Sequence, residues 1–230
     1  GKATDTSVVY AELKKKFDGV VYKRRIPVPL CQARKYLYYG IRQIEESQIL
    51  KEIDYVLKNL SSAVNQTAYF SVLSGGEVLY LLEERVATPI TIQAKRGYKY
   101  PAYATGIGKA LLSGKTEKDI KTLYPEGLYK LTEHTIDDFD TLFSQMEETQ
   151  KSGYSFEKEE SNKDVQCIAV PVKYKENVIA GMSVAVPVFY YSEEFEKKAM
   201  EELKKAKQHI EKLIQDNTQE WVYSPLGTET

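Results

Sequence analysis

The chain has 230 residues, of which 42% are hydrophobic and 28% charged, and its formal net charge is −1. This composition is typical of a globular protein with one large domain, or one domain and a small appendage. No apolar run approaches the roughly 20 residues that cross a bilayer. We expect neither a secretory leader nor a membrane partner. The expected location is the cytoplasm.

Cysteine and histidine are scarce. Cys31 and Cys167 lie far apart, without the spacing of a metal site or a redox motif, which favours a reducing compartment. The histidines are His134 and His209. We therefore expect no zinc site built from these residue types, and no cofactor.

The charge is unevenly distributed. Residues 1–43 carry ten lysines and arginines against three acidic residues, whereas residues 44–230 carry 22 basic and 30 acidic residues. A basic segment joined to an acidic body suggests that the first part faces a polyanion. The alternative is a solvated surface helix with a disordered end.

The basic segment has its own pattern. Residues 7–17 are compatible with a short helix and residues 20–22 with a strand, while two prolines in 26–32 indicate a loop before a return strand in 34–43. This order is that of the last part of a winged helix-turn-helix, although many unrelated arrangements share it.

The body of the chain alternates helical and extended patterns. Apolar residues recur every three or four positions from residue 45 to 60, which predicts an amphipathic helix of about four turns. Ser74-Gly75-Gly76 predicts a hairpin. Six strands are expected, at residues 68–73, 77–82, 90–94, 154–157, 167–174 and 177–188. Further helices are expected at 105–112, 117–124, along the stripe Phe139, Leu142, Phe143 and Met146, and at 193–216. Strands bracketed and interrupted by helices predict an α+β sheet domain.

Residues 100–114 read YPAYATGIGKALLSG and place a lysine behind two glycines. A phosphate-binding loop of the Walker type needs a glycine six residues before that lysine and a Ser or Thr directly after it. The chain has Tyr103 and Ala110 there. Nucleotide binding is therefore not predicted, and the segment is interpreted as a helix start with another role.

Several segments resemble the IclR family of bacterial transcriptional regulators in the same order. They are YLYYGIRQIEE, like a wing strand entering a linker helix; ILKEIDYVLKNLSSAVNQTAYFSVLSGGEVLYL, like that helix and a first hairpin; KRGYKYPAYATGIGKALLSG; and KSGYSFEKEESNKDVQCIAVPVKYKENVIAGMSVAVP. The third resembles the family's Pro-x-x-Ala-(Thr/Ser)-x-x-Gly-Lys-Ala-x-Leu segment and the fourth its closing Cys-x-Ala-x-Pro-Val motif. Together they cover about residues 36–215.

The resemblance implies a regulator with two domains, which self-associates to dimers or tetramers. It places part of a winged helix-turn-helix, or a basic arm, at 1–43, a linker helix at 44–62 and an effector-binding domain at 63–217. That domain is expected to be a GAF/PAS-like α+β fold with a central antiparallel six-stranded sheet. Too few residues precede Ser7 for a complete winged domain. The expected contacts to operator DNA are Lys14, Lys15, Lys16, Lys23, Arg24 and Arg25.

The resemblance also implies an effector cavity near the start of the helix at 105–112. The matching positions are Pro89, Gly106, Ile107, Glu157, Val165, Cys167, Ser183 and Ala185. Glu157 stands where the family often has aspartate, and Ala185 where serine is common, so a changed effector is expected. Thr105 joins this set because the first amides of a helix lack internal acceptors and attract anions such as a small organic acid. Its hydroxyl is also suited to cap the helix, and Cys167 to pack as a core residue.

Lys109 follows on the same helix. Its side chain could pair with the acidic run at 157–160 or with a partner chain, or it could stay exposed. Direct contact with the ligand is the least expected of these roles.

Three functions are compared. The first is a ligand-responsive transcriptional regulator. The second is an enzyme with Cys167 as its nucleophile, but no base for this thiol is evident from the sequence. The third is a sensor that acts through protein contacts and does not bind DNA. The sequence favours the first.

Overall fold

The structure, a computed structural model, describes residues 47–86 and 99–217. The chain divides into two compact units, residues 1–50 and 51–230, and the fold below is that of the second. The predictions for 1–43 and for a strand at 90–94 lie outside the described residues. In the part that is described, none of the helices is long and apolar enough to cross a membrane.

The helix predicted from the apolar stripe at 45–60 is confirmed as α3 (Gln48–Val64). Ile53, Leu57 and Leu60 on this stripe are buried. Tyr55 lies off the stripe and is 63% exposed. The helix is therefore held by one apolar face, as its periodicity predicts.

Six antiparallel strands form one sheet, in the order β3-β2-β1-β6-β5-β4. They are β1 (Thr67–Ser74), β2 (Glu77–Glu84), β3 (Lys99–Pro101), β4 (Ser155–Lys158), β5 (Val165–Tyr174) and β6 (Asn177–Pro187). The first and last strands pair in the middle of the sheet, where Tyr69 lies opposite Ser183. The expected α+β fold with a six-stranded antiparallel sheet is thus confirmed.

One strand of the sheet was not predicted, the three-residue edge strand β3, in which Tyr100 pairs with Val78. The strand predicted at 90–94 lies outside the described residues and stays a prediction. Three residues are too short to show an alternating pattern. Pro101, which has no amide proton to donate, is tolerated because it stands on the edge of the sheet.

The hairpin predicted at Ser74-Gly75-Gly76 is confirmed, and a second one joins the last two strands. Gly75 and Gly76 have φ values of +58° and +86°, which glycine adopts without steric cost, and they join β1 to β2. The turn between Tyr174 and Asn177 joins β5 to β6.

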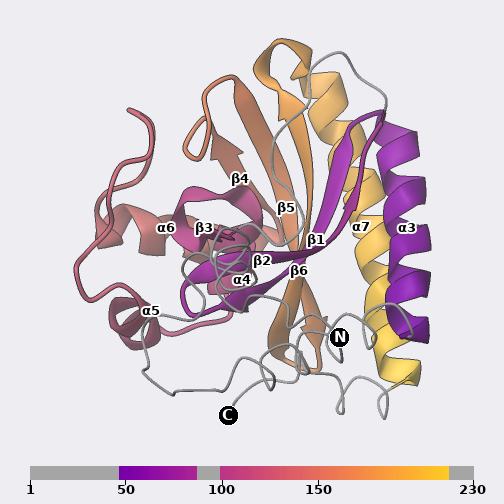
Figure 1. Cartoon of the computed structure of the whole chain (residues 1–230), viewed down its shortest axis with the longest axis horizontal. Coiled ribbons are helices and arrows are strands. Elements are labelled where there is room, and N and C mark those ends of the chain that lie inside the picture. Colours follow the sequence, from indigo (N-terminus) through magenta and orange to yellow (C-terminus); the bar gives the residue numbers. More distant parts are fainter. Residues whose placement is uncertain (1–46, 87–98, 218–230) are drawn as a thin grey trace, which may run out of the picture. The chain divides into compact units, whose positions relative to one another are not determined.

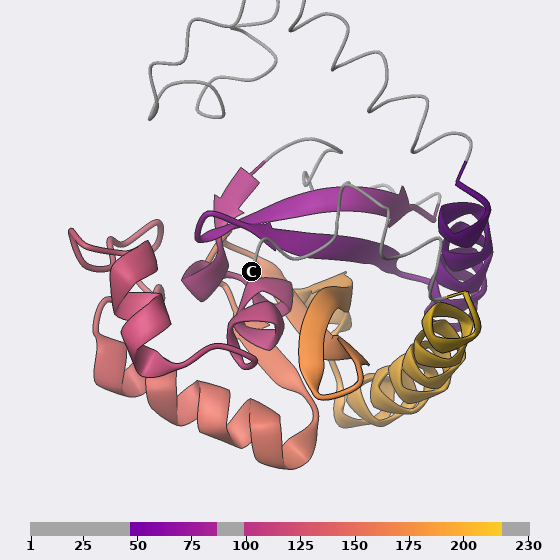
Figure 2. The same ribbon diagram turned by 90° about the horizontal axis from the view of Figure 1, so that it is seen from below.

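Helices cover both faces of the sheet (Figures 1 and 2). One face carries α4 (Gly106–Leu112), with α5 (Glu117–Leu123) and α6 (Phe139–Ser152) beyond it; the other carries α3 and α7 (Glu193–Asp216). The predicted helix at 193–216 is confirmed with the same bounds, and every third or fourth residue of it is buried. The short helix α4 is the element that borders the candidate site.

Candidate functional site

The start of α4 is shaped by close packing against the short helical turn Ala102–Ala104. Thr105 is the N-cap: its hydroxyl oxygen accepts a hydrogen bond from the amide of Gly108 at 3.0 Å. A Cβ on Gly108 would lie 2.1 Å from the carbonyl oxygen of Ala102. The predicted cap is confirmed, and Gly108 is required because backbone passes where a side chain would stand.

The sheet places predicted site residues in two adjacent rows beneath α4. In the first row Glu157 pairs with Cys167, which pairs with Ala185. In the second, Ser183 lies opposite Tyr69. Side chains two residues apart on a strand share a face. Residues from β4, β5, β6 and β1 are thereby brought under the first turn of α4.

These rows and α4 enclose a small cavity of about 30 Å³. This volume is room for one or two water molecules. Seven of the nine predicted ligand residues line it: Thr105, Gly106, Ile107, Val165, Cys167, Ser183 and Ala185. Five further lining residues were not predicted: Tyr69, Tyr80, Tyr100, Ser161 and Asn162. Pro89 lies outside the described residues.

Glu157 stands directly behind the cavity wall. Its Cβ lies 3.3 Å from the position of a Cβ added to Gly106, and its side chain is 1% exposed. Its Oε1 accepts hydrogen bonds from the amides of Glu160 (2.7 Å) and Ser161 (3.0 Å), whereas Oε2 has no partner. Burial raises the pKa of this carboxyl, and the hydrogen bond from the Ser161 amide opposes the rise.

Cys167 is a free, half-buried thiol beside this carboxyl. Burial, and then the charge of Glu157, raise the pKa of the thiol well above its ordinary value. His134 is 51% exposed in a turn and His209 is exposed on α7. The thiol therefore lacks the lowered pKa of a cysteine nucleophile, and neither histidine is placed to act as its base.

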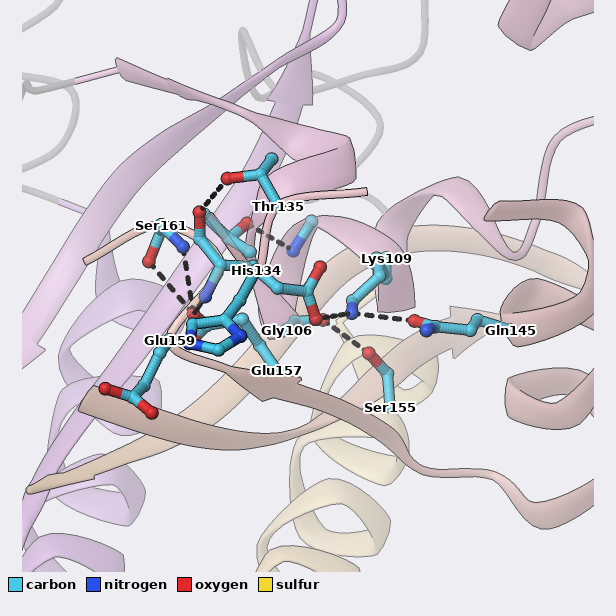
Figure 3. Close-up of polar contacts among 12 residues, drawn as sticks. Gly106, Lys109, His134, Thr135, Gln145, Ser155, Glu157, Glu159 and Ser161 are labelled. Atoms are coloured by element: carbon cyan, nitrogen blue, oxygen red, sulfur yellow. Dashed lines mark hydrogen bonds and ion pairs between the residues drawn. The ribbon is translucent and has the colours of Figure 1, made fainter. Parts of the chain in front are cut away.

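Lys109 joins three segments of the chain (Figure 3). Its Nζ donates to Glu160 Oε1 at 2.6 Å and to Gln145 Oε1 at 2.8 Å, and its side chain is 1% exposed. Of the possibilities that the sequence leaves open, pairing with the acidic run is therefore correct. The lysine is a buried, paired cation and does not line the small cavity.

A broader groove of about 720 Å³ lies between α6, β4 and the segment around residue 137. It contains none of the predicted ligand residues, and its buried lining residues are Ile136, Thr149, Ser155 and Glu160. We place the candidate site at the smaller cavity because apolar walls and buried polar groups converge there, which is how ligand sites are built. In the described part of the chain, no group of His, Cys, Asp or Glu is arranged to hold a metal ion.

Comparison with known proteins identifies the family of the chain. Residues 41–212 match the family model "Bacterial transcriptional regulator IclR C-terminal". The HTH-type transcriptional regulator KdgR of Escherichia coli K12 is 28% identical over 162 residues, which are 70% of this chain and 62% of that protein. The chain thus spans less than two thirds of this relative.

Solved structures share the fold. The C-terminal domain of E. coli KdgR is 26% identical and superposes with a TM-score of 0.64 over 73% of this chain and 99% of that one. An IclR homolog from Microbacterium hydrocarbonoxydans, complexed with 4-hydroxybenzoate, is 20% identical and has a TM-score of 0.68 over 76% of this chain and 72% of that one.

Proposed function

The chain belongs to the IclR family of bacterial transcriptional regulators, and from this premise we propose that its sheet domain binds a small effector in the cavity beneath α4. Binding there changes the affinity of a DNA-binding segment for its operator. The α+β fold is the family's GAF-like C-terminal domain. The family is one of regulators rather than enzymes.

The observation that carries this proposal is the convergence of buried polar side chains at one cavity. Tyr69 contributes a hydroxyl without a hydrogen-bond partner, and Ser183 and Cys167 add a buried hydroxyl and a thiol. A buried polar group without a partner costs about 1–3 kcal/mol. A ligand that accepts the hydrogen bond of Tyr69 removes this cost, which supports binding at this cavity.

A small organic acid is the proposed effector. The amides of Gly106 and Ile107 precede the first internal hydrogen bond of α4, so a ligand oxygen is able to accept from them. The homolog from Microbacterium is complexed with an aromatic acid, 4-hydroxybenzoate. Thr105, Val165 and Pro89 complete the proposed ligand set, with Glu157 behind it.

Operator DNA is the proposed macromolecular partner. Its contacts are assigned to Lys14, Lys15, Lys16, Lys23, Arg24 and Arg25, because residues 1–43 hold an excess of positive charge. Self-association to a dimer or tetramer belongs to the same proposal. The alternative is a sensor that acts through protein contacts alone.

The effector part is tested by thermal unfolding of the whole chain with a panel of small organic acids. A ligand at about 100 times its dissociation constant adds about 2.7 kcal/mol to the free energy of unfolding. Ala185→Leu fills the cavity and abolishes the shift, whereas Ala199→Ser on the opposite face keeps it. A panel without any stabilising acid argues against the proposed effector class.

The DNA part is tested by footprinting on the upstream region of the protein's own gene, using the complete protein. We expect one protected sequence whose protection changes with the stabilising acid. Replacing Lys14, Lys15 and Lys16 by alanine weakens protection and its salt dependence. Protection without sequence preference would favour the sensor that acts through protein contacts.

A further inference from the structure

Three tyrosines form one wall of the cavity. Tyr69, Tyr80 and Tyr100 lie on the neighbouring strands β1, β2 and β3. The ring centroids of Tyr69 and Tyr80 are 5.2 Å apart and those of Tyr80 and Tyr100 are 6.4 Å apart, and both pairs meet edge to face. Such a chain of rings is a rigid surface, because each ring fixes the next.

The hydroxyl of Tyr69 is the unusual group in this wall. The residue is 2% exposed, and its hydroxyl has no hydrogen-bond partner within 3.5 Å, although the Glu83 carboxylate is near enough to attract its proton. Glu83 lies opposite Tyr69 on β2, but its two carboxylate oxygens accept from Nε and Nη2 of Arg85 at 2.7 and 2.9 Å. Burial, and then the charge of Glu83, raise the pKa of the phenol, so the hydroxyl keeps its proton.

The charges around the cavity limit what it accepts. Among the described lining residues there is no lysine, arginine or histidine. Two acidic residues adjoin its walls: the buried Glu157 carboxyl behind Gly106, and Glu83, which lies opposite Tyr69 and pairs with Arg85. A dianion would therefore meet one buried carboxylate without a compensating cation, which is costly in a low-dielectric interior. A cation is disfavoured because Glu157 Oε2 is covered and the Glu83 carboxylate is already paired with Arg85.

Resting on the proposed effector cavity, we propose that Tyr69 donates its hydroxyl hydrogen bond to the effector and selects its chemical class. The ligand presents an acceptor oxygen on a small planar group, such as a carbonyl or carboxyl, and carries at most one negative charge. Tyr80 and Tyr100 hold the Tyr69 ring in place from the side. No covalent step is involved.

The experiment uses four fragments on the whole chain: acetamide, acetate, malonate and methylammonium. Acetamide and acetate match in size and shape and differ in charge. Binding is followed through the amide resonances of Cys167 and Ser183 in a titration by nuclear magnetic resonance. We expect acetamide and acetate to bind and the other two to leave these resonances unchanged. Tyr69→Phe raises the dissociation constants of acetamide and acetate about tenfold, which corresponds to one hydrogen bond of about 1.4 kcal/mol. Tyr55→Phe, at an exposed position of α3, leaves both constants unchanged.

Each outcome decides something different. If no fragment binds the wild-type chain, the proposed effector cavity fails and this inference fails with it. If acetate and acetamide bind the Tyr69→Phe variant as tightly as the wild type, the role of Tyr69 is refuted while the cavity stands. Preference for malonate or methylammonium would overturn the chemical class.

Unfolding of the ligand-free variants gives a second readout that needs no ligand. Removing an unpaired buried hydroxyl relieves its desolvation, so Tyr69→Phe raises the urea midpoint. Tyr103 is the matched contrast, since its hydroxyl donates to the carbonyl of Tyr129 at 2.9 Å and accepts from the amide of Tyr129 at 3.0 Å. Tyr103→Phe lowers the midpoint. A lowered midpoint for Tyr69→Phe would show that the hydroxyl serves folding and would overturn the assignment.

Discussion

The Lys109 ammonium lies 2.6 Å from a Glu160 carboxylate oxygen, and both side chains are buried. This contact ties α4 to the segment that follows β4, and Gln145 adds α6 to the same cation (Figure 3). The amide of Glu160 in turn donates to Glu157. The polar contacts behind the cavity therefore form one connected set.

Breaking this ion pair from one side should be costly. Lys109→Met leaves the Glu160 carboxylate buried without its cation, and we expect a loss of about 3–5 kcal/mol in the free energy of unfolding. The double variant Lys109→Met, Glu160→Leu should recover most of the loss, because no buried charge then lacks a partner. Urea denaturation of both single variants and the double variant measures the coupling. Additive losses would contradict the pairing.

The two glycines of the GIGK sequence should respond differently to alanine. Gly108→Ala drives a methyl group against backbone, 2.1 Å from the carbonyl oxygen of Ala102, and we expect a loss of about 3 kcal/mol. Gly106→Ala meets the Cβ of Cys167 at 3.1 Å, where a small adjustment suffices, and should cost about 1 kcal/mol. Urea midpoints compare the two directly. Equal losses would mean that the turn before α4 relaxes more than its packing indicates.

Glu157 should make stability depend on pH. Burial raises the pKa of this carboxyl, so the folded chain keeps the proton at pH values where the unfolded chain has lost it. Its contribution is therefore complete below the ordinary value near 4.5 and is lost as pH rises through the folded-state pKa. Relative to Glu157→Gln, which does not titrate, the wild type should lose stability over that window.

The measurement is urea denaturation of both proteins from acidic to neutral pH. Glu160, Lys109 and Cys167 face the same carboxyl and are kept unchanged. Glu147→Gln on the exposed side of α6 removes an equal charge as a control. A difference between wild type and Glu157→Gln that stays constant with pH would contradict the raised pKa.

The Cys167 thiol should react slowly with alkylating reagents. Burial and the neighbouring Glu157 raise its pKa, so little thiolate is present near neutral pH. We expect iodoacetamide to label it more slowly than it labels free glutathione. Peptide mass mapping separates Cys167 from Cys31. Labelling faster than glutathione would return the nucleophilic enzyme to consideration.

The sequence predicts most of the regular elements because their signals are local. The apolar stripe of α3, the glycines before β2 and the matching bounds of α7 all follow from periodicity and turn chemistry. The edge strand β3 is not predicted because its three residues are too few to show a pattern.

The sequence does not predict the wall formed by the three tyrosines, for a different reason. Tyr69, Tyr80 and Tyr100 meet only through the pairing of three strands, and a count of 18 tyrosines does not say which of them converge. The partner of Lys109 is likewise set by tertiary packing, so the sequence leaves it open among several possibilities.

The pairing of β1 with β6 fixes when this domain is able to form during synthesis. Thr67 lies opposite Ala185, so the central ladder waits until the ribosome has released almost the whole domain. Until then the β1–β2 hairpin presents an open edge with Tyr69 and Phe70 beside it, a surface prone to association with other chains. Slow translation or premature termination before β6 should therefore leave a nascent chain that depends on chaperones.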